Sequence, residues 1–161
     1  MSAVDLFQAA RERLAEVARE GLGELVQPRR LLGIPRAPRI VPRGSAWHVG
    51  VLLVGEEDVF AVGDILRAHA EVRRGFTAES QRQRAALAAA AFRGGFDEGA
   101  TVHIGWQRLD PTAVDGGAAS GPLALVGGVP SVRWSASGGF APLAGYLEER
   151  ISLVRTPPPG A

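Results

Sequence analysis

The sequence of 161 residues contains no lysine, no cysteine and no asparagine, and all eighteen of its basic residues are arginine. Without cysteine the chain cannot form a thiolate nucleophile, a disulfide or a thiolate-ligated metal site. Without lysine it cannot form a Schiff base, a Ser-Lys dyad or the lysine contact of a P-loop. Any covalent catalysis must therefore depend on hydroxyl or carboxyl side chains, or on three histidines.

Net charge and long apolar runs are also scarce. The formal net charge is +1 at pH 7, so no strong overall field attracts nucleic acid or an anionic membrane. No apolar run approaches the ~18 residues that a membrane span requires, and the run at residues 49–54 has the length of a strand. The first residues mix acids and arginines with apolar side chains, unlike a signal peptide. With the missing cysteine, these features predict a cytoplasmic protein that does not bind membranes.

The periodicity predicts one α+β domain over residues 1–155, followed by a flexible proline-rich tail at 156–161. Three helices are predicted, at 3–26, 78–93 and 142–154. Apolar residues recur at spacings of three and four in the first and the last, whereas the middle helix is polar in its first half, nearly all alanine and leucine in its second, and ends at Gly94-Gly95. Strand-like patterns occupy residues 47–54, 59–72, 101–109 and 123–135, the last with a Gly-Gly hairpin turn. Tight turns between strands favour an antiparallel sheet of about five to six strands, with the helices packed on one face.

Three histidines are candidates for a polar cluster. His48 and His103 both precede an apolar residue and a glycine on predicted strands, and His69 lies on a third strand. If those strands were neighbours in register, the imidazoles could meet and hold a metal, or one could activate a Ser or Thr hydroxyl in a hydrolase. No HExxH or HxH motif occurs, so we expect each ring to be hydrogen-bonded separately, with no metal and no cofactor.

A helix start near residue 78 is a candidate anion site. Free N–H groups and the helix dipole attract phosphate or carboxylate groups at such positions. Four side chains would contribute, namely Arg73, Arg74, Thr77 and Ser80. Glu79 would compete for the same donors, so the alternative is a solvated turn with Thr77 as the helix cap.

An arginine- and proline-rich segment spans residues 28–43. It contains five arginines, Arg29, Arg30, Arg36, Arg39 and Arg43, and no acid occurs between Glu24 and Glu56. Such a run could follow a phosphate backbone, but it contains no aromatic residue on which a base could stack. Two interpretations stay open: an extended arm that contacts a partner, or a loop whose arginines pair with nearby carboxylates such as Glu24.

Two segments resemble a small family of uncharacterised proteins from GC-rich bacteria, some of which are called glutaminases. They are FTAESQRQRAALAAAAFRGGFDEGATVHIGW at residues 76–106 and GGVPSVRWSASGGFAPLAGYLEERISLVRTPPPGA at residues 127–161. The resemblance would imply amide hydrolysis. Glutaminases of known mechanism depend on a cysteine triad, a Ser-Lys pair or a threonine assisted by lysine, and this chain can form none of these sites.

The composition therefore favours a small binding or protein-interaction domain without catalysis. We expect a protein partner or a second copy of the chain, and a small anionic ligand is an alternative. A hydrolase that uses a Ser or Thr hydroxyl with one histidine is a second hypothesis, and a nucleic-acid-associated protein that uses the segment 28–43 is a third.

Overall fold

The computed structural model describes residues 1–30, 32–71, 75 and 78–160. Four helices and ten strands form there, in a seven-stranded and a three-stranded sheet, which confirms the α+β class. The chain divides into two compact units, each assembled from separate stretches: unit 1 is Met1–Arg19, Ala46–Val62 and Gln107–Ala161, and unit 2 is Glu20–Ser45 and Gly63–Trp106. The two units alternate along the chain, so no single cut in the sequence would separate them. The single domain over residues 1–155 stays a prediction. No helix among the described residues could span a bilayer.

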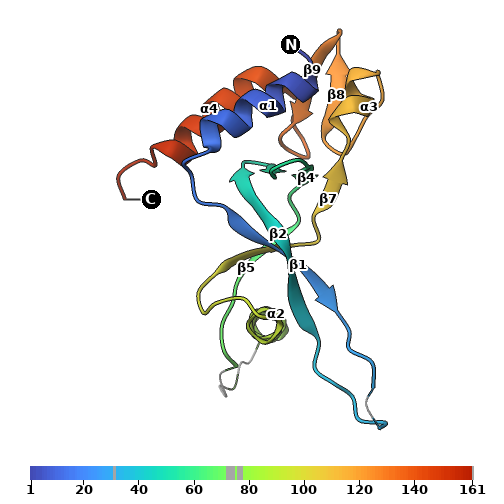
Figure 1. Ribbon diagram of the computed structural model, residues 1–161, viewed down its shortest axis with the longest axis vertical. Coiled ribbons are helices and arrows are strands. Elements are labelled where there is room, and N and C mark those ends of the chain that lie inside the picture. Colours follow the sequence, from blue (N-terminus) through green and yellow to red (C-terminus); the bar gives the residue numbers. More distant parts are fainter. Residues whose placement is uncertain (31, 72–74, 76–77, 161) are drawn as a thin grey trace. The chain divides into compact units, whose positions relative to one another are not determined.

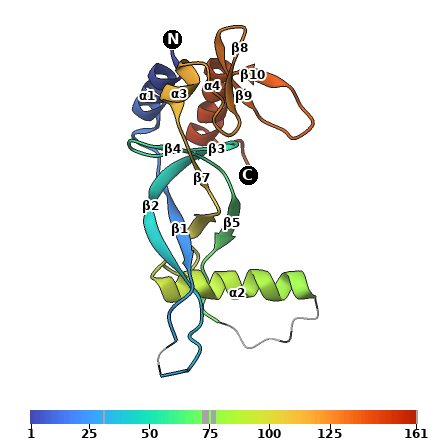
Figure 2. The same cartoon turned by 90° about the vertical axis from the view of Figure 1, so that its right-hand side faces the viewer.

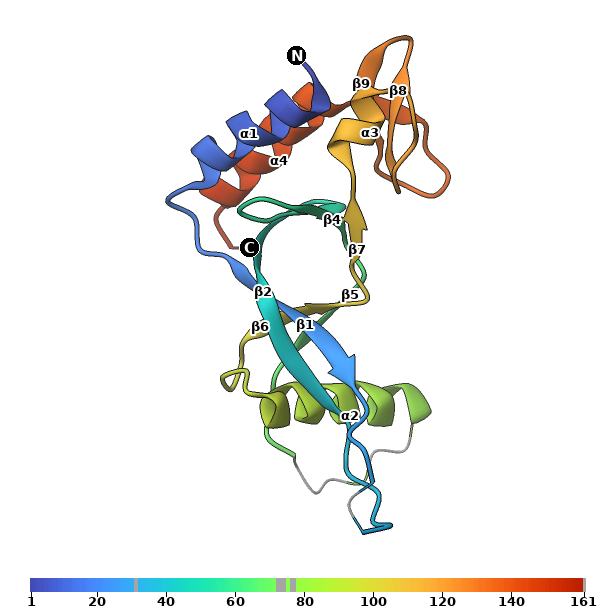
Figure 3. The same cartoon turned by 45° about the vertical axis from the view of Figure 1, so that its right-hand side comes forward.

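Unit 1 contains three helices and the smaller sheet. The helices are α1 (Ala3–Leu14), α3 (Pro111–Asp115) and α4 (Leu143–Arg155). The three-stranded antiparallel sheet contains β8 (Leu123–Val126), β9 (Val129–Arg133) and β10 (Phe140–Pro142), and β8 and β9 form the predicted Gly-Gly hairpin. Figures 1 and 3 show α1 and α4 side by side. The apolar stripe of α1, with Phe7, Ala10 and Leu14, is buried in the core of this unit, so it is not an exposed partner surface.

Unit 2 contains one helix, α2 (Glu79–Gly94), and strands β1 (Glu20–Val26), β5 (Asp64–Arg67) and β6 (Thr101–Ile104). It also contains the first half of β2 (Arg39–Val49), which continues into unit 1. There the sheet proceeds through β3 (Leu52–Val54), β4 (Val59–Ala61) and β7 (Gln107–Leu109). β5 pairs with β6 antiparallel, but β1 pairs with β6 parallel, so the sheet is mixed and not purely antiparallel as predicted.

The predicted first helix, 3–26, is too long, because residues 20–26 form β1. Leu22 and Leu25 fit the helical spacing, but Gly21 and Gly23 lower helix propensity at this end. In the fold, Gly23 is needed for packing: a Cβ there would lie 2.5 Å from the Ile40 side chain and 2.9 Å from that of Val102. The glycine thus marks the close approach of neighbouring strands and not the end of a helix.

Two predicted strands are each divided by a glycine with positive φ. Gly50 (φ 62°) turns the predicted strand 47–54 into the hairpin of β2 and β3, and Gly105 (φ 67°) separates β6 from β7. Between the predicted strands at 101–109 and 123–135 the chain forms the short helix α3, whose N-terminus Asp110 caps by accepting a hydrogen bond from the Ala113 N–H at 2.9 Å. Alternation alone does not show these breaks, since glycine is also tolerated within strands.

The C-terminal end of α2 lies directly on β2. A Cβ at Gly94 would be 1.7 Å from the Ile40 carbonyl oxygen, so only glycine permits this approach. Arg93 Nη2 donates to the Pro38 carbonyl oxygen at 2.9 Å, and Ala89, Ala90 and Ala91 are buried one turn earlier. The first half of the helix, residues 79–84, is exposed, as its polar sequence predicts. Figure 2 shows α2 lying beside β5.

Replacement of Gly94 tests this contact between α2 and β2. We expect Gly94→Ala to destabilise the fold by roughly 3 kcal/mol, because the new methyl group meets backbone and the helix must move. Gly145→Ala is the matched control in α4: nothing lies within 4 Å of the position that its new methyl group would take, and the change should stabilise by about 0.5–1 kcal/mol. Urea unfolding of both variants measures the difference. Equal stability of the two variants would contradict the close contact.

Candidate functional site

A groove of about 810 Å³ lies between β5 and α2 in unit 2. All four residues of β5, Asp64 to Arg67, line it, together with residues from one face of α2. Successive side chains of a strand point to opposite faces, so a groove that all four residues line runs along the edge of β5. Its volume is within the range of ligand-binding pockets, about 300–1,000 Å³.

β5 is an edge strand. It stands at one end of the seven-stranded order and pairs with β6 on one side, with no described strand on the other. In an antiparallel pair, alternate residues direct both N–H and C=O away from the partner strand. Two of the four residues of β5 therefore present main-chain donors and acceptors to the groove, which is the surface that pairs with an added strand.

The groove has an apolar floor and a charged rim. Leu66 and Leu87 are half-buried and pack against the core cluster of unit 2, which contains Ala68, Ala90 and Ala91. Arg67 and Arg84 are exposed, and neither forms an ion pair within the described part of the chain. Asp64 also lines the groove, so two arginines face one carboxylate there and the local charge is positive even with histidine neutral.

His69 closes one end of the groove. Its backbone N–H donates to the Ala88 carbonyl oxygen of α2 at 3.1 Å, and its ring Nδ1 lies 2.6 Å from Glu98 Oε1. The Ala70 N–H donates to the other carboxylate oxygen at 2.8 Å. These hydrogen bonds, first that of His69 and then that of Ala70, lower the pKa of the Glu98 carboxyl below its ordinary value. Because the carboxylate accepts this hydrogen bond, the proton is on Nδ1, and Nε2 takes no part in the contact with Glu98.

A histidine with a carboxylate behind it suits general-base chemistry, which the hydrolase hypothesis requires. Among the described residues that line the groove, the one hydroxyl is that of Ser80, eight residues before Ala88 on α2. At about 1.5 Å per residue, Ser80 lies roughly 12 Å along the helix from the point where His69 is attached. That separation is far beyond hydrogen-bond reach, so Ser80 does not supply a hydroxyl to His69.

The other two histidines have polar partners within their own units. His48 Nε2, on β2 in unit 1, lies 2.9 Å from the Gly50 carbonyl oxygen. His103, on β6 in unit 2, is fully buried, with Nε2 3.4 Å from Glu20 Oε1. His69 forms no hydrogen bond with either of them in the described residues. The hydrogen-bond partner of the His69 ring is thus Glu98.

Most of the predicted anion site lies outside the described residues. Arg73, Arg74 and Thr77 are among the residues that the structure does not describe. The helix α2 begins at Glu79, and its N-cap is Ala78, which forms no side-chain hydrogen bond. Ser80 is described and lines the groove between β5 and α2.

Apart from His69 and Ser80, the residues that line the groove were not predicted as site residues from the sequence, Arg67, Arg84, Leu66 and Leu87 among them. Alternation around Leu66 indicates a half-buried strand, and the polar first half of the helix indicates that Arg84 is exposed. No local pattern shows which strand lies at an edge, because that depends on the pairing of strands that are distant in sequence.

The arginine- and proline-rich segment joins β1 to β2 and enters β2 at Arg39 (Figure 2). Arg43 forms an ion pair with Glu24, as the loop interpretation predicts. The other four arginines, Arg29, Arg30, Arg36 and Arg39, are exposed and have no ion pair among the described residues. Both interpretations of the segment stay open.

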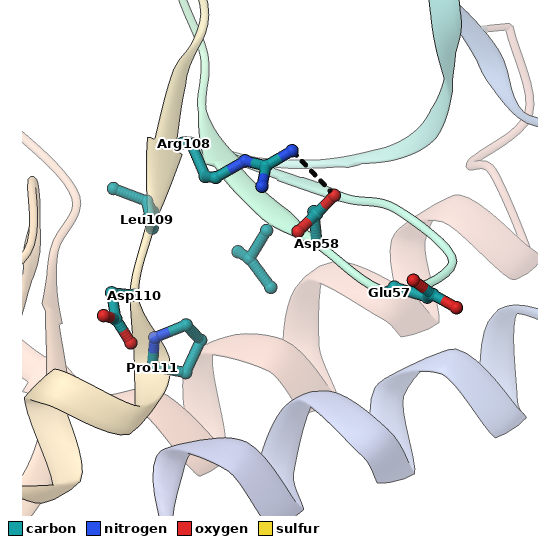
Figure 4. Close-up of a pocket in the computed structure, with 7 residues that line it drawn as sticks. Glu57, Asp58, Arg108, Leu109, Asp110 and Pro111 are labelled. Carbon is teal, nitrogen blue, oxygen red and sulfur yellow. Dashed lines mark hydrogen bonds and ion pairs between the residues drawn. The ribbon is translucent and has the colours of Figure 1, made fainter.

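A second recess, of about 420 Å³, lies beside β4 and β7 in unit 1 (Figure 4). Its polar groups are used by the fold. Arg108 reaches toward Asp58, with 3.1 Å between Nη2 and Oδ2, and Asp110 caps α3. The Glu57 carbonyl oxygen accepts a hydrogen bond from Arg11 at 2.9 Å. The recess therefore offers few groups to a ligand, and the groove between β5 and α2 is the better candidate.

The pair formed by Glu98 and His69 should make the free energy of unfolding depend on pH. The folded chain keeps this carboxylate ionised to lower pH than the unfolded chain, so the pair stabilises the fold above the ordinary pKa of glutamate. We expect wild type to exceed Glu98→Gln in stability above the ordinary pKa of glutamate and to lose this advantage progressively as the pH falls below it. Urea midpoints measured from pH 3 to 7 test this. The neighbouring Asp97→Asn removes a charge and keeps the pair, so an identical profile for both variants would refute the assignment.

Comparison with protein-family models, with curated proteins and with solved structures finds no match. No relative therefore supplies a residue role, a ligand or a partner for this chain. Its function has to be argued from the open edge of β5, the groove beside it and the side chains that line that groove.

Proposed function

We propose that this chain is a cytoplasmic protein-interaction domain without catalysis of its own, which binds an extended segment of a partner protein in the groove between β5 and α2. The observation that carries the proposal is the open edge of β5, all of whose residues line a groove with an apolar floor. An extended peptide can add to such an edge as a further strand, with main-chain hydrogen bonds supplying affinity and side-chain pockets supplying specificity.

The dimensions of the site suit this mode of binding. β5 is four residues long, so the bound segment would pair over about the same length. The contact is small, and association would be weak and reversible, with a Kd of about 10 μM. Residues from α2 would cover one side of the added strand, as helix residues do in peptide grooves beside edge strands.

Catalysis is not part of the proposal because the reactive groups of the groove are separated. His69 has a carboxylate partner, but Ser80 lies roughly 12 Å away along α2. The glutaminase activity implied by the resemblance would need cysteine or lysine, and the chain has neither. Nucleic-acid binding would depend on the exposed arginines at 29–39, and no described aromatic side chain lies within that segment to stack on a base.

Blocking the groove tests the proposal. Random dodecapeptides displayed on phage are selected on the full chain, and the best binder is measured by fluorescence anisotropy. Ala85→Trp fills the groove from α2 and should weaken binding at least about tenfold. Ala86→Trp is the matched control, because Ala86 is exposed on the same helix and does not line the groove. Failure to select any peptide, or equal affinities for the two variants, would overturn the proposal, provided both have the wild-type unfolding midpoint.

Methylation of the peptide backbone tests the strand pairing itself. An added strand directs every second N–H toward β5, so single N-methyl groups should weaken binding at alternate positions only. We expect a loss of about fivefold or more per sensitive position, because a lost main-chain hydrogen bond costs roughly 1 kcal/mol or more. A scan with no period of two would show that the peptide binds in another conformation.

A further inference from the structure

From the side chains at the two faces of β5 we infer that the groove selects an extended segment in which an acidic residue is followed or preceded directly by an apolar one. The inference rests on the proposed function and names the chemistry of the bound segment. The acidic residue would lie opposite Arg67, and its apolar neighbour would contact Leu66 and Leu87.

The two faces of β5 differ in chemistry. Leu66 packs against the cluster that includes Ala90 and Ala91 of α2, so it points toward the helix, and Asp64 shares its face by alternation. Ile65 and Arg67 therefore point to the opposite face, and Ile65 is 49% exposed. An added strand would present its own side chains alternately to these two surfaces.

The residue opposite Arg67 meets a guanidinium that has no ion pair among the described residues. Opposite charges placed directly across two strands attract, and a planar guanidinium can bind a carboxylate through two hydrogen bonds. On this face Ile65 supplies an apolar neighbour for the stem of the acidic side chain. A glutamate or aspartate is therefore the best complement at this position.

The next residue of the added strand points toward α2. There it meets Leu66, Leu87, Ala85 and Ala88, which form a floor of apolar side chains. Burial of an aliphatic side chain on such a floor contributes favourably, whereas a charged group would lose water without a partner. Arg84 stands at the rim on the same side and adds to the positive field, which favours an acidic segment overall.

A nucleic acid is a poorer complement to the same arginines. Asp64 lines the groove and would repel a phosphate backbone, and the described residues that line it include no Phe, Tyr or Trp to stack on a base. A single-stranded oligonucleotide offers no main-chain hydrogen bonds to the edge of β5. Binding of a peptide and binding of a nucleic acid can be distinguished by experiment, because only the affinity for nucleic acid would fall steeply with salt concentration.

The test uses the full chain and the selected peptide. We expect aspartate or glutamate to be enriched next to an aliphatic residue among the selected sequences. Replacing that acid by its amide should weaken binding about threefold to tenfold in wild type, and replacing it by lysine should weaken it further. With R67E the preference should reverse, so that the lysine peptide binds more tightly than the acidic one. R82E is the charge-matched control, because Arg82 pairs with Glu79 outside the groove, and it should keep the wild-type preference.

The outcomes separate the inference from the proposed function. If acid and amide peptides bind equally, or if R67E and R82E act alike, the inference is wrong, while the loss caused by Ala85→Trp still supports a peptide groove. If Ala85→Trp has no effect, both are wrong. If a twelve-nucleotide oligothymidine displaces the peptide with a steep salt dependence, the site binds nucleic acid and the inference is overturned.

Discussion

The backbone contact between the end of α2 and β2 is the constraint on which the candidate site depends. Gly94 admits the Ile40 carbonyl oxygen at a distance that no other residue permits, and Arg93 holds the adjoining Pro38 carbonyl. The short alanine side chains before them let the helix lie close to the sheet over one turn. Because this end is held, the preceding turns of α2 extend beside β5, and their spacing from that strand determines the groove.

The chemistry of the groove follows from the same division of α2. Its buried half is alanine, which packs closely but fills little volume, and Leu87 supplies a larger side chain where the helix begins to leave the core. The exposed half is polar and places Arg84 at the rim. At the other end, the backbone hydrogen bond from His69 to Ala88 joins the strand segment to the helix and closes the groove. The site is therefore short, open on one side and bounded by main-chain contacts.

The edge of β5 is short and charged. The strand is only four residues long and carries a charge at each end, Asp64 and Arg67, both features that discourage uncontrolled pairing between copies. The same features narrow the set of segments that could add to it. In the proposed mode of binding, a short, charged edge beside a helix would accept a complementary strand and disfavour a long apolar one, so the charges that discourage uncontrolled pairing would also supply the selectivity.

Some elements could be predicted from local patterns, and others could not. The polar and apolar halves of α2 and the hairpin at Gly127 and Gly128 are visible in the sequence because the causes are local: side-chain polarity along one helix, and the positive φ of two adjacent glycines. The helix predicted over 3–26 was wrong beyond Leu14, because Leu22 and Leu25 fit a helical stripe as well as they fit a strand. Gly21 and Gly23 weaken the helix there. It is the pairing with β6 and the packing of Gly23 against Ile40 and Val102 that make this segment a strand.

By itself the sequence determined which chemistries are absent, since a chain without cysteine and lysine cannot build their sites in any fold. It also determined that a positive groove would carry arginine, whose planar guanidinium suits carboxylates. Only the tertiary structure decided that Asp64 to Arg67 form an edge, that α2 lies beside them and that His69 and Ser80 stand apart. The reason is that edges and grooves depend on which distant segments pair, and the pairing of β6 with both β5 and β1 is set by contacts across the fold and not by any local pattern.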